Sequence, residues 1–242
     1  MDILILIIAS TFFVSLISFI GVFSLALKEE QLKRMLLVLV ALSAGALMGG
    51  AFLHLIPEAI KQSSENVFSF VLIGFVLFFF IEKILHWRHC HDGKCSIHTF
   101  AYLNLLGDGI HNFVDGIIIA ASFLSNLSLG VTTTFAIALH EIPQEIGDFG
   151  VLLYAGINRT KALLFNFICA LAAIAGGIFA YFLYYNLISS SFFLLPFAAG
   201  GFVYIAATDL IPEIKKEISL KKSLPIFFVF ILGILIMFLL KG

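Results

Sequence analysis

Charged side chains are scarce in this chain. Asp, Glu, Lys and Arg make up 12% of its 242 residues, about half the share in a typical soluble domain. Hydrophobic residues make up 61%, which excludes a disordered chain and an ordinary water-soluble enzyme. The 14 basic and 15 acidic residues nearly cancel, so the charge balance gives no support for nucleic-acid binding. Three cysteines are too few for a disulfide scaffold.

The chain consists instead of long apolar runs, most of them near the 20 or so residues that a membrane-spanning helix needs. We therefore predict an all-α integral membrane protein with eight transmembrane helices, forming a single domain over 1–242. The first run is too long for the apolar region of a signal peptide, so we expect a retained helix. The expected helices cover 3–27, 35–56, 67–85, 101–125, 130–155, 162–186, 192–211 and 224–240.

Basic residues are distributed unevenly between the two predicted sides. If the N-terminus lies outside, 12 of the 14 Lys and Arg fall in inside loops, and only Lys61 and Lys241 lie outside. Because loops rich in Lys and Arg stay on the cytoplasmic side, the distribution predicts that both termini lie outside.

Two helix ends share a sequence pattern. The second run ends in His-Leu-Ile-Pro-Glu at 54–58 and the seventh ends in Asp-Leu-Ile-Pro-Glu at 209–213. Gly45 and Gly200 each lie nine residues before the start of this pattern. The two runs cross in opposite directions, so we predict an inverted repeat that relates helices 1–3 to helices 6–8 around central helices 4 and 5. Chance similarity of two Gly-rich helices that end in Pro is the alternative.

A polar stripe follows one side of the fourth run and another follows the fifth. Charged side chains are costly in a bilayer, so these residues need a partner, water or an ion. At 100° per residue, most of the first stripe falls within about 60° of arc. The stripes consist of Asn104, Asp108, His111, Asn112 and Asp115, and of His140, Glu141, Gln144, Glu145 and Asp148.

The two stripes also share a local pattern, in which a His is followed by polar residues at +1 and +4. His111 and His140 lie about ten residues into their runs, near the expected midplane. A residue at +4 lies on the same helix face as the His, so two facing helices can close a four-ligand metal site. Pro143 frees the carbonyl of Leu139, which we expect to line a cavity. A polar network that only holds the helices together is the alternative reading.

The ligand types limit the cargo. Imidazole, carboxylate and amide groups without thiolate favour Zn²⁺, with Fe²⁺, Mn²⁺, Co²⁺ or Cd²⁺ as alternatives, and disfavour Cu⁺. Asp115 lies between the His pair and the pair formed by Asn112 and Glu141, so the pattern allows either one or two bound ions.

The motifs His-Asn-Phe-x-Asp-Gly at 111–116 and His-Glu-Ile-Pro-x-Glu-Ile-Gly-Asp at 140–148 resemble the signature of ZIP metal transporters. Further similarity lies at 53–58, 81–83 and 200–206. The resemblance implies a divalent-metal importer, most simply a compact homodimer in the cytoplasmic (plasma) membrane. It implies elevator-like movement of a helix bundle, with the metal as substrate and no catalytic cofactor.

The resemblance also implies a ligand set. One metal position would use His111, Asp115, His140 and Gln144, where the branch usually has a second His in place of Gln144. The neighbouring position would use Asn112, Glu141 and Asp115, with Asn166 as a further candidate. Additional metal or pathway candidates are Glu145, Asp148, Asp108, His54, Glu58 and Asp209.

Several of these residues have simpler readings. His54 and Glu58 either receive metal from outside or cap a helix that stops at Pro57. Asp209 and Glu213 either form an exit path or pair with neighbouring lysines. The predicted cytoplasmic loop at 86–100 resembles the His-rich loop of ZIP proteins, but it is equally readable as a solvated loop. Its candidate metal ligands are His86, His89, Cys90, His91, Cys95 and His98.

An intramembrane zinc hydrolase is the main functional alternative. His140-Glu141 resembles the start of the His-Glu-x-x-His protease motif, in which the Glu acts as general base. The fifth position is Gln144, however, and we expect Pro143 to break the helix between them. These two departures favour transport over hydrolysis.

Overall fold

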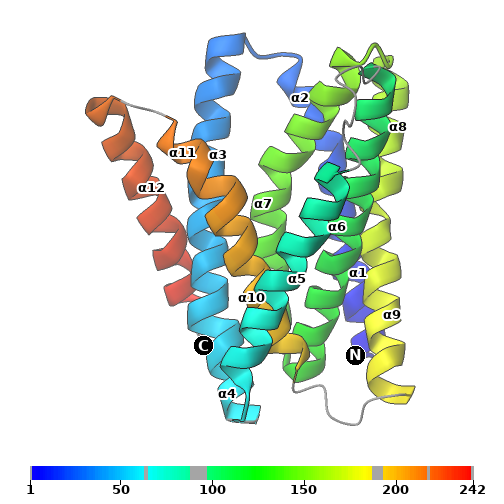
Figure 1. The fold of residues 1–242 in the computed structure, drawn as a ribbon, viewed down its shortest axis with the longest axis vertical. Coiled ribbons are helices and arrows are strands. Elements are labelled where there is room, and N and C mark those ends of the chain that lie inside the picture. Colours follow the sequence, from blue (N-terminus) through cyan, green and yellow to red (C-terminus); the bar gives the residue numbers. More distant parts are fainter. Residues whose placement is uncertain (1, 63–64, 88–96, 187–192, 217–218, 241–242) are drawn as a thin grey trace.

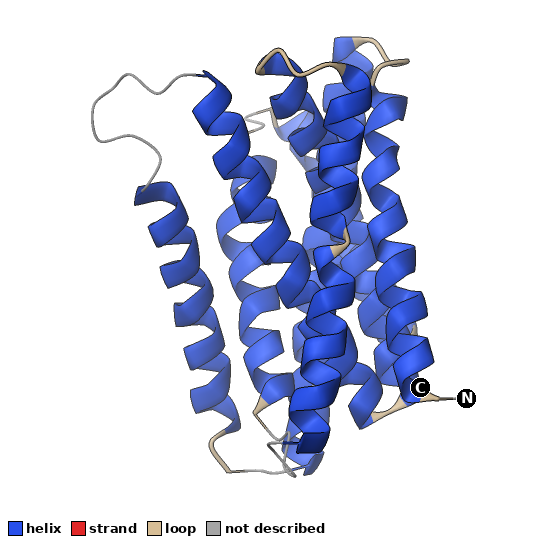
Figure 2. Ribbon diagram, turned by 90° about the vertical axis from the view of Figure 1, so that its right-hand side faces the viewer, coloured by secondary structure: helices blue, strands red, loops and turns tan. Residues whose placement is uncertain are grey.

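We describe the fold from a computed structural model, which covers residues 2–62, 65–87, 97–186, 193–216 and 219–240. The side chains of residues 85–103 and 185–192 lie outside the described part. All regular secondary structure within the described ranges is helical, arranged as eight long helical segments in one bundle (Figures 1 and 2). Both ends of the chain lie at the same end of the bundle (Figure 2).

The eight segments follow one another along the chain with short connections. Five of them are single helices or simple pairs: α5 (Val67–Trp87), α6 (Ile97–Ser125), α7 (Leu127–Tyr154), α8 (Arg159–Ala170) with α9 (Ala172–Asn186), and α12 (Leu220–Leu239). The first segment combines α1 (Ile3–Ser15), the 3₁₀ turn η1 (Leu16–Ile20) and α2 (Gly21–Ser24). The second combines α3 (Glu29–Gly49), η2 (Gly50–Leu55) and α4 (Ile56–Gln62), and the seventh combines α10 (Leu194–Ile205), η3 (Ala206–Leu210) and α11 (Ile211–Lys215).

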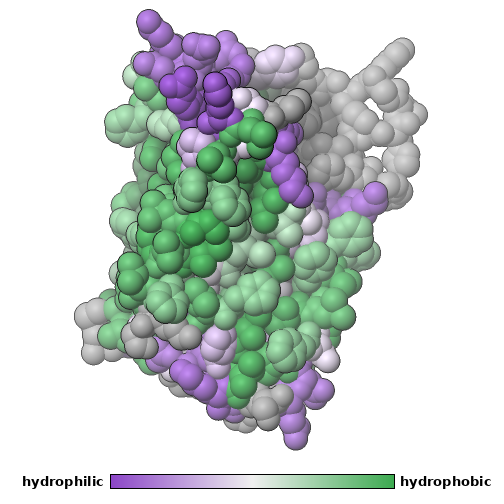
Figure 3. Space-filling model, turned by 90° about the vertical axis from the view of Figure 1, so that its left-hand side faces the viewer, coloured by the Kyte–Doolittle hydropathy of each residue, from purple (hydrophilic) through white to green (hydrophobic). Residues whose placement is uncertain are grey.

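Six of these segments are long and apolar enough to cross a membrane, among the residues that the structure describes. They carry many of the large exposed apolar side chains, such as Phe23 and Phe68. The surface shows an apolar band between two polar ends, as expected for a membrane protein (Figure 3). The two other long helices, α6 and α7, carry the polar stripes and pack against each other inside the bundle.

Helix ends agree with the sequence prediction to within about four residues, except in the second segment. It begins at Glu29 instead of residue 35, because acidic residues suit the first turn of a helix and Glu29 pairs with Lys33 at 2.6 Å. It also continues through Pro57 to Gln62, so the expectation that the helix stops at Pro57 is wrong.

A wide turn explains how this helix passes Pro57. Residues Gly50–Leu55 form a π-helix, in which the N–H of Ile56 donates to the carbonyl of Ala51, five residues earlier. The extra residue per turn accommodates the missing proline N–H without ending the helix. The seventh segment has the same device at Ala206–Leu210, just before Pro212.

Helix α6 is held closely against α9 by two glycines. A Cβ atom on Gly116 would lie 1.9 Å from the carbonyl oxygen of Ala173, and one on Gly176 would lie 1.9 Å from that of Phe113. Only residues without a side chain allow this approach. The contact fixes the part of α6 that carries the polar stripe.

Candidate metal site

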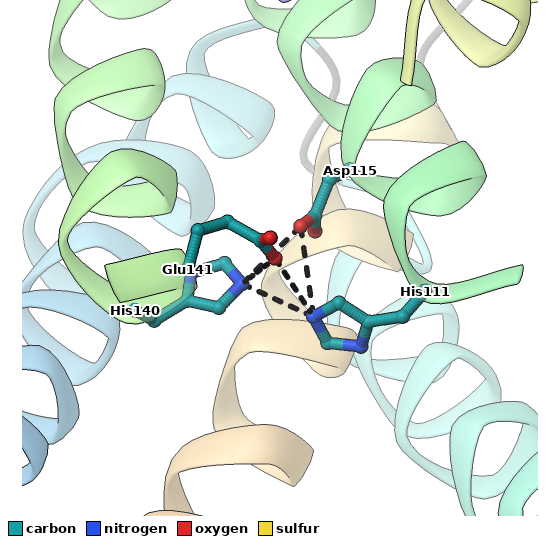
Figure 4. Close-up of side chains that lie close together, drawn as sticks. All are labelled: His111, Asp115, His140 and Glu141. Atoms are coloured by element: carbon teal, nitrogen blue, oxygen red, sulfur yellow. Dashed lines mark hydrogen bonds and ion pairs between the residues drawn. The ribbon is translucent and has the colours of Figure 1, made fainter. Parts of the chain in front are cut away.

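The polar stripes of α6 and α7 face each other and bring four side chains together. His111 and Asp115 come from α6, and His140 and Glu141 come from α7 (Figure 4). One potential ligand atom from each residue lies within 4.8 Å of all the others. Two imidazoles and two carboxylates at this spacing match the ligand types that Zn²⁺ takes in proteins.

Asp115 and Glu141 each place a carboxylate oxygen close to both imidazoles (Figure 4). Asp115 Oδ2 lies 3.2 Å from His140 Nε2 and 3.6 Å from His111 Nε2. Glu141 Oε1 lies 3.3 Å from His140 Nε2 and 3.5 Å from His111 Nε2. The two Nε2 atoms are 3.1 Å apart. All four side chains therefore point at one common centre.

The centre is almost completely enclosed. Asp115, His140 and Glu141 are at most 1% exposed, while the side chain of His111 is 19% exposed. Both Asp115 carboxylate oxygens, Glu141 Oε1 and His140 Nδ1 are buried without a hydrogen-bond partner. Burying unsatisfied carboxylate oxygens is costly. A cation at the common centre would satisfy those that face it.

Pro143 acts differently from the sequence expectation. It does not break α7, which runs without interruption from Leu127 to Tyr154. The Leu139 carbonyl that it frees accepts a hydrogen bond from Ser43 Oγ on α3 at 2.6 Å, and Leu139 is not among the residues that line the cavity described below. This bond joins α3 to the turn of α7 that precedes His140, and sequence reasoning provided no signal for it.

Two predicted ligands contact an acidic neighbour of the centre. The Asn112 Nδ2 atom donates to Asp108 Oδ1 at 2.9 Å, and Gln144 Nε2 donates to the same oxygen at 3.4 Å. Asn112 Oδ1 and Asp108 Oδ2 are buried and lack a partner. Glu141 occupies the place beside the two imidazoles that was predicted for Gln144.

The remaining acids of the stripe are each held by an amide from another helix. Asn166 on α8 donates to Glu145 Oε2 at 2.9 Å, and Asn104 on α6 donates to Asp148 Oδ1 at 2.8 Å. Glu145 Oε1 has no partner and is buried. The polar residues of the two stripes, together with Asn166, thus form a continuous polar layer between α6, α7 and α8.

A cavity of about 340 Å³ connects the centre to one end of the bundle. Of the four clustered residues it is lined by His111, and its polar lining comes from the first half of α6, the second half of α7, and the ends of α5, α10 and η3. The Tyr204 hydroxyl donates to Glu82 on one wall. The polar lining residues are Glu82, Asn104, Asp108, His111, Gln144, Asp148, Tyr204 and Asp209.

Comparison with known proteins decides the family. The sequence matches the model of the family described as "ZIP Zinc transporter" over residues 1–94 and 88–241, which together are nearly the whole chain. The chain belongs to the ZIP zinc transporter family.

Several curated ZIP proteins are similar to it. Zinc transporter zipt-7.2 of Caenorhabditis elegans is 31% identical, over 85% of this chain and 58% of that protein. Zinc transporter ZIP13 of Pongo abelii is 34% identical over 83% and 65%, and that of Mus musculus is 32% identical over 84% and 69%. The chain thus spans about three fifths of the length of the first two relatives.

Membership in the ZIP family removes support for the hydrolase alternative, because the family consists of transporters rather than enzymes. A His-Glu-x-x-His protease requires a second imidazole at the fifth position of this motif, one turn after His140 on α7. Gln144 occupies it, and its amide contacts Asp108.

His54 and Glu58, predicted at the outer end of the second helical segment, lie away from the four-residue centre. His54 Nε2 lies 2.7 Å from the carbonyl oxygen of Met237 on α12. Glu58 pairs with Lys61 at 3.1 Å and accepts a hydrogen bond from Ser125 at 3.3 Å. Both residues therefore contribute contacts between helices at the end opposite the cavity.

At the cavity end, the two predicted acids behave differently. Asp209 lines the cavity, which fits a place on a pathway. Glu213 pairs with Lys216 on the surface, which confirms the simpler reading for that residue. The predicted loop ligands lie outside the described part of the chain, either in 88–96 or among side chains that are not described.

Proposed function

We propose that this protein transports a divalent metal ion, Zn²⁺ in the first place, through the site between α6 and α7. One observation carries the proposal: four ligands, three of them buried, converge at one centre, and the fourth, His111, lines a cavity that opens at one end of the bundle. A resident structural ion does not need such an access route, whereas a transported ion does. Fe²⁺, Mn²⁺ and Cd²⁺ are the alternative cargoes, because the ligand set contains no thiolate.

His111, Asp115, His140 and Glu141 would bind the ion in this proposal. This set has Glu141 in place of Gln144 when it is compared with the first metal position expected from the family resemblance, which assigned Glu141 to the neighbouring position. A carboxylate is a stronger zinc ligand than a neutral amide, and Glu141 Oε1 is the buried oxygen that lacks a donor. The ion would next bind to a neighbouring group formed by Asp108, Asn112 and Gln144. The same polar layer continues through Asn166, Glu145 and Asp148.

We infer the direction of transport from the orientation that the charge distribution predicts, together with the importer role that the family resemblance implies. The cavity opens at the end where α6 begins and α7 ends, which is the end that the distribution of Lys and Arg assigns to the cytoplasm. The protein would therefore release metal into the cytoplasm through Asp148 and Asp209. Location in the plasma membrane with both termini outside, and assembly as a homodimer, remain predictions.

We also infer that helices 1–3 and 6–8 form an inverted repeat. An offset of 155 residues relates Gly45 to Gly200 and Pro57 to Pro212. A π-helix precedes each proline, and the two helices run in opposite directions (Figure 1).

The paired glycines make equivalent contacts, which supports the repeat further. A Cβ atom on Gly45 would lie 2.0 Å from the carbonyl oxygen of Phe230 on α12, the last helix of the other half. A Cβ atom on Gly200 would lie 2.1 Å from that of Val71 on α5. The second helix thus packs on the eighth as the seventh packs on the third, as a two-fold relation between the halves requires.

Metal uptake into liposomes tests the proposed function. Purified protein is reconstituted with a zinc indicator inside, and wild type is compared with Asp115→Ala and with the control Glu29→Gln, which changes an exposed acid. We expect uptake by wild type and the control, and none by Asp115→Ala. Absence of uptake of every divalent ion by folded wild-type protein would refute transport, and normal uptake by Asp115→Ala would refute the site.

A further inference from the structure

The hydrogen bond between Ser43 and the Leu139 carbonyl joins two helices next to the proposed ligands. Leu139 directly precedes His140, and the carbonyl would normally accept from the N–H of residue 143, which is a proline. Ser43 is 1% exposed, so its hydroxyl needs an acceptor within the protein. The Ser43 hydroxyl is thus the replacement for the donor that Pro143 lacks.

The geometry favours this bond over a competing one within α3. Ser43 Oγ lies 2.8 Å from the carbonyl of Leu39 and 2.6 Å from that of Leu139. The Leu39 carbonyl already has the helical N–H of Ser43 within α3, whereas Leu139 has lost its own helical donor. The single hydroxyl proton therefore stabilises the structure most when it is donated to Leu139.

Neither Ser43 nor Pro143 has a counterpart at the position to which the internal sequence similarity relates it. The pattern that aligns His111 with His140 places Val114 in α6 opposite Pro143. The repeat that aligns Gly45 with Gly200 places Ala198 in α10 opposite Ser43, and Ala198 is also buried. The Ser43 hydroxyl and Pro143 therefore occur together, and the places equivalent to them carry neither a hydroxyl nor a proline.

We propose that Ser43 is a positioning residue for the metal site. Its hydroxyl fixes the α7 turn that carries His140 and Glu141 against α3, so that both side chains point at the common centre. This inference rests on the proposed function, because the ligands it positions are those of the transported ion. It adds a residue from α3 to a site whose ligands come from α6 and α7 alone.

The test is a double-mutant cycle of Ser43→Ala and Pro143→Ala. Zinc affinity is measured on the purified full-length protein in detergent, by competition with a zinc chelator. Ser43→Ala should weaken zinc binding by about tenfold, the lower end of the usual effect of losing a group that orients a ligand. Ser122→Ala is the matched control, because within the described part of the chain this buried hydroxyl bonds only to the Ile118 carbonyl of its own helix. We expect the control to bind zinc as wild type does.

A second substitution makes the reasoning specific. Pro143→Ala restores an N–H that can serve the Leu139 carbonyl, so adding Ser43→Ala to Pro143→Ala should change zinc affinity by less than about twofold. The absorption spectrum of bound Co²⁺ should change in Ser43→Ala alone, and match Pro143→Ala in the double variant. These spectra report ligand geometry, which a role confined to stability would leave unchanged.

Three results separate the different failures. Ser43→Ala with wild-type zinc affinity would overturn the inference and leave the proposed function intact. The same tenfold loss in both the wild-type and the Pro143→Ala backgrounds would also overturn it, because the hydroxyl would then act independently of the proline. Wild-type protein that neither binds nor transports zinc would contradict the proposed function itself.

Discussion

The substitution Glu141→Gln tests whether Glu141 completes the centre around the two imidazoles, a place that the family resemblance assigns to Gln144. Glu141 Oε1 lies within 3.5 Å of both imidazole Nε2 atoms, whereas Gln144 donates to Asp108 at 3.4 Å. The change keeps the size of the side chain and removes its charge. We expect it to weaken zinc binding far more than Gln144→Ala does.

The expected magnitude follows from the number of ligands. Four protein ligands in a structural zinc site together contribute about 10–16 kcal/mol, or about 3 kcal/mol each. An amide oxygen retains some affinity for the ion, so Glu141→Gln should cost about 2–3 kcal/mol, which is about a 30- to 150-fold loss. Gln144→Ala removes one long hydrogen bond worth about 1 kcal/mol, which corresponds to about fivefold.

Chelator competition on purified protein measures both affinities, and thermal unfolding shows whether each variant is folded. Liposome uptake at low zinc should follow the same order. The reasoning is refuted if Gln144→Ala loses as much zinc affinity as Glu141→Gln, or if Glu141→Gln binds zinc within a few-fold of wild type. Either result would favour the ligand set that includes Gln144.

Packing, surface charge and ligand chemistry lead to three further predictions. Gly116→Ala should destabilise the protein by about 1–3 kcal/mol in thermal unfolding, because the new methyl group would overlap the Ala173 carbonyl. The control Gly109→Ala places a methyl group where no described atom lies within 4 Å, so it should unfold at the wild-type temperature. Glu213→Gln removes an exposed ion pair with Lys216 and should change stability by less than about 1 kcal/mol and leave uptake intact; lost uptake would instead place Glu213 on the pathway. Zinc uptake should be inhibited by Cd²⁺ and Co²⁺ but not by Cu⁺, and strong inhibition by Cu⁺ would contradict the thiolate-free site.

The sequence was sufficient to predict the helices and the pairing of the two stripes. Apolar runs of membrane length indicate helices directly, and the spacing of His111 and Asp115 places them on one face. The extension of the second helix beyond Pro57 was missed, because a proline usually ends a helix and the π-helix that accommodates it leaves no local signature.

The finer arrangement of the site depends on contacts between distant helices. Nothing local in the sequence distinguishes Glu141 from Gln144 as the residue that faces the imidazoles, because both lie on the same side of α7. The amide of Gln144 is drawn toward Asp108, which belongs to another helix. Likewise, the donor for the Leu139 carbonyl is 96 residues away in the chain, at Ser43.

The short connection between α6 and α7 has a consequence for how the protein enters the membrane. The three acids of α7, namely Glu141, Glu145 and Asp148, would cost about 8–10 kcal/mol if that helix inserted alone with all of them near the bilayer centre. Their partners lie mainly on α6, and only Asn126 separates the two helices. We therefore expect the translocation machinery to release α6 and α7 together, as a hairpin whose polar faces already cover each other. The first three helical segments would then be inserted in the bilayer before this hairpin.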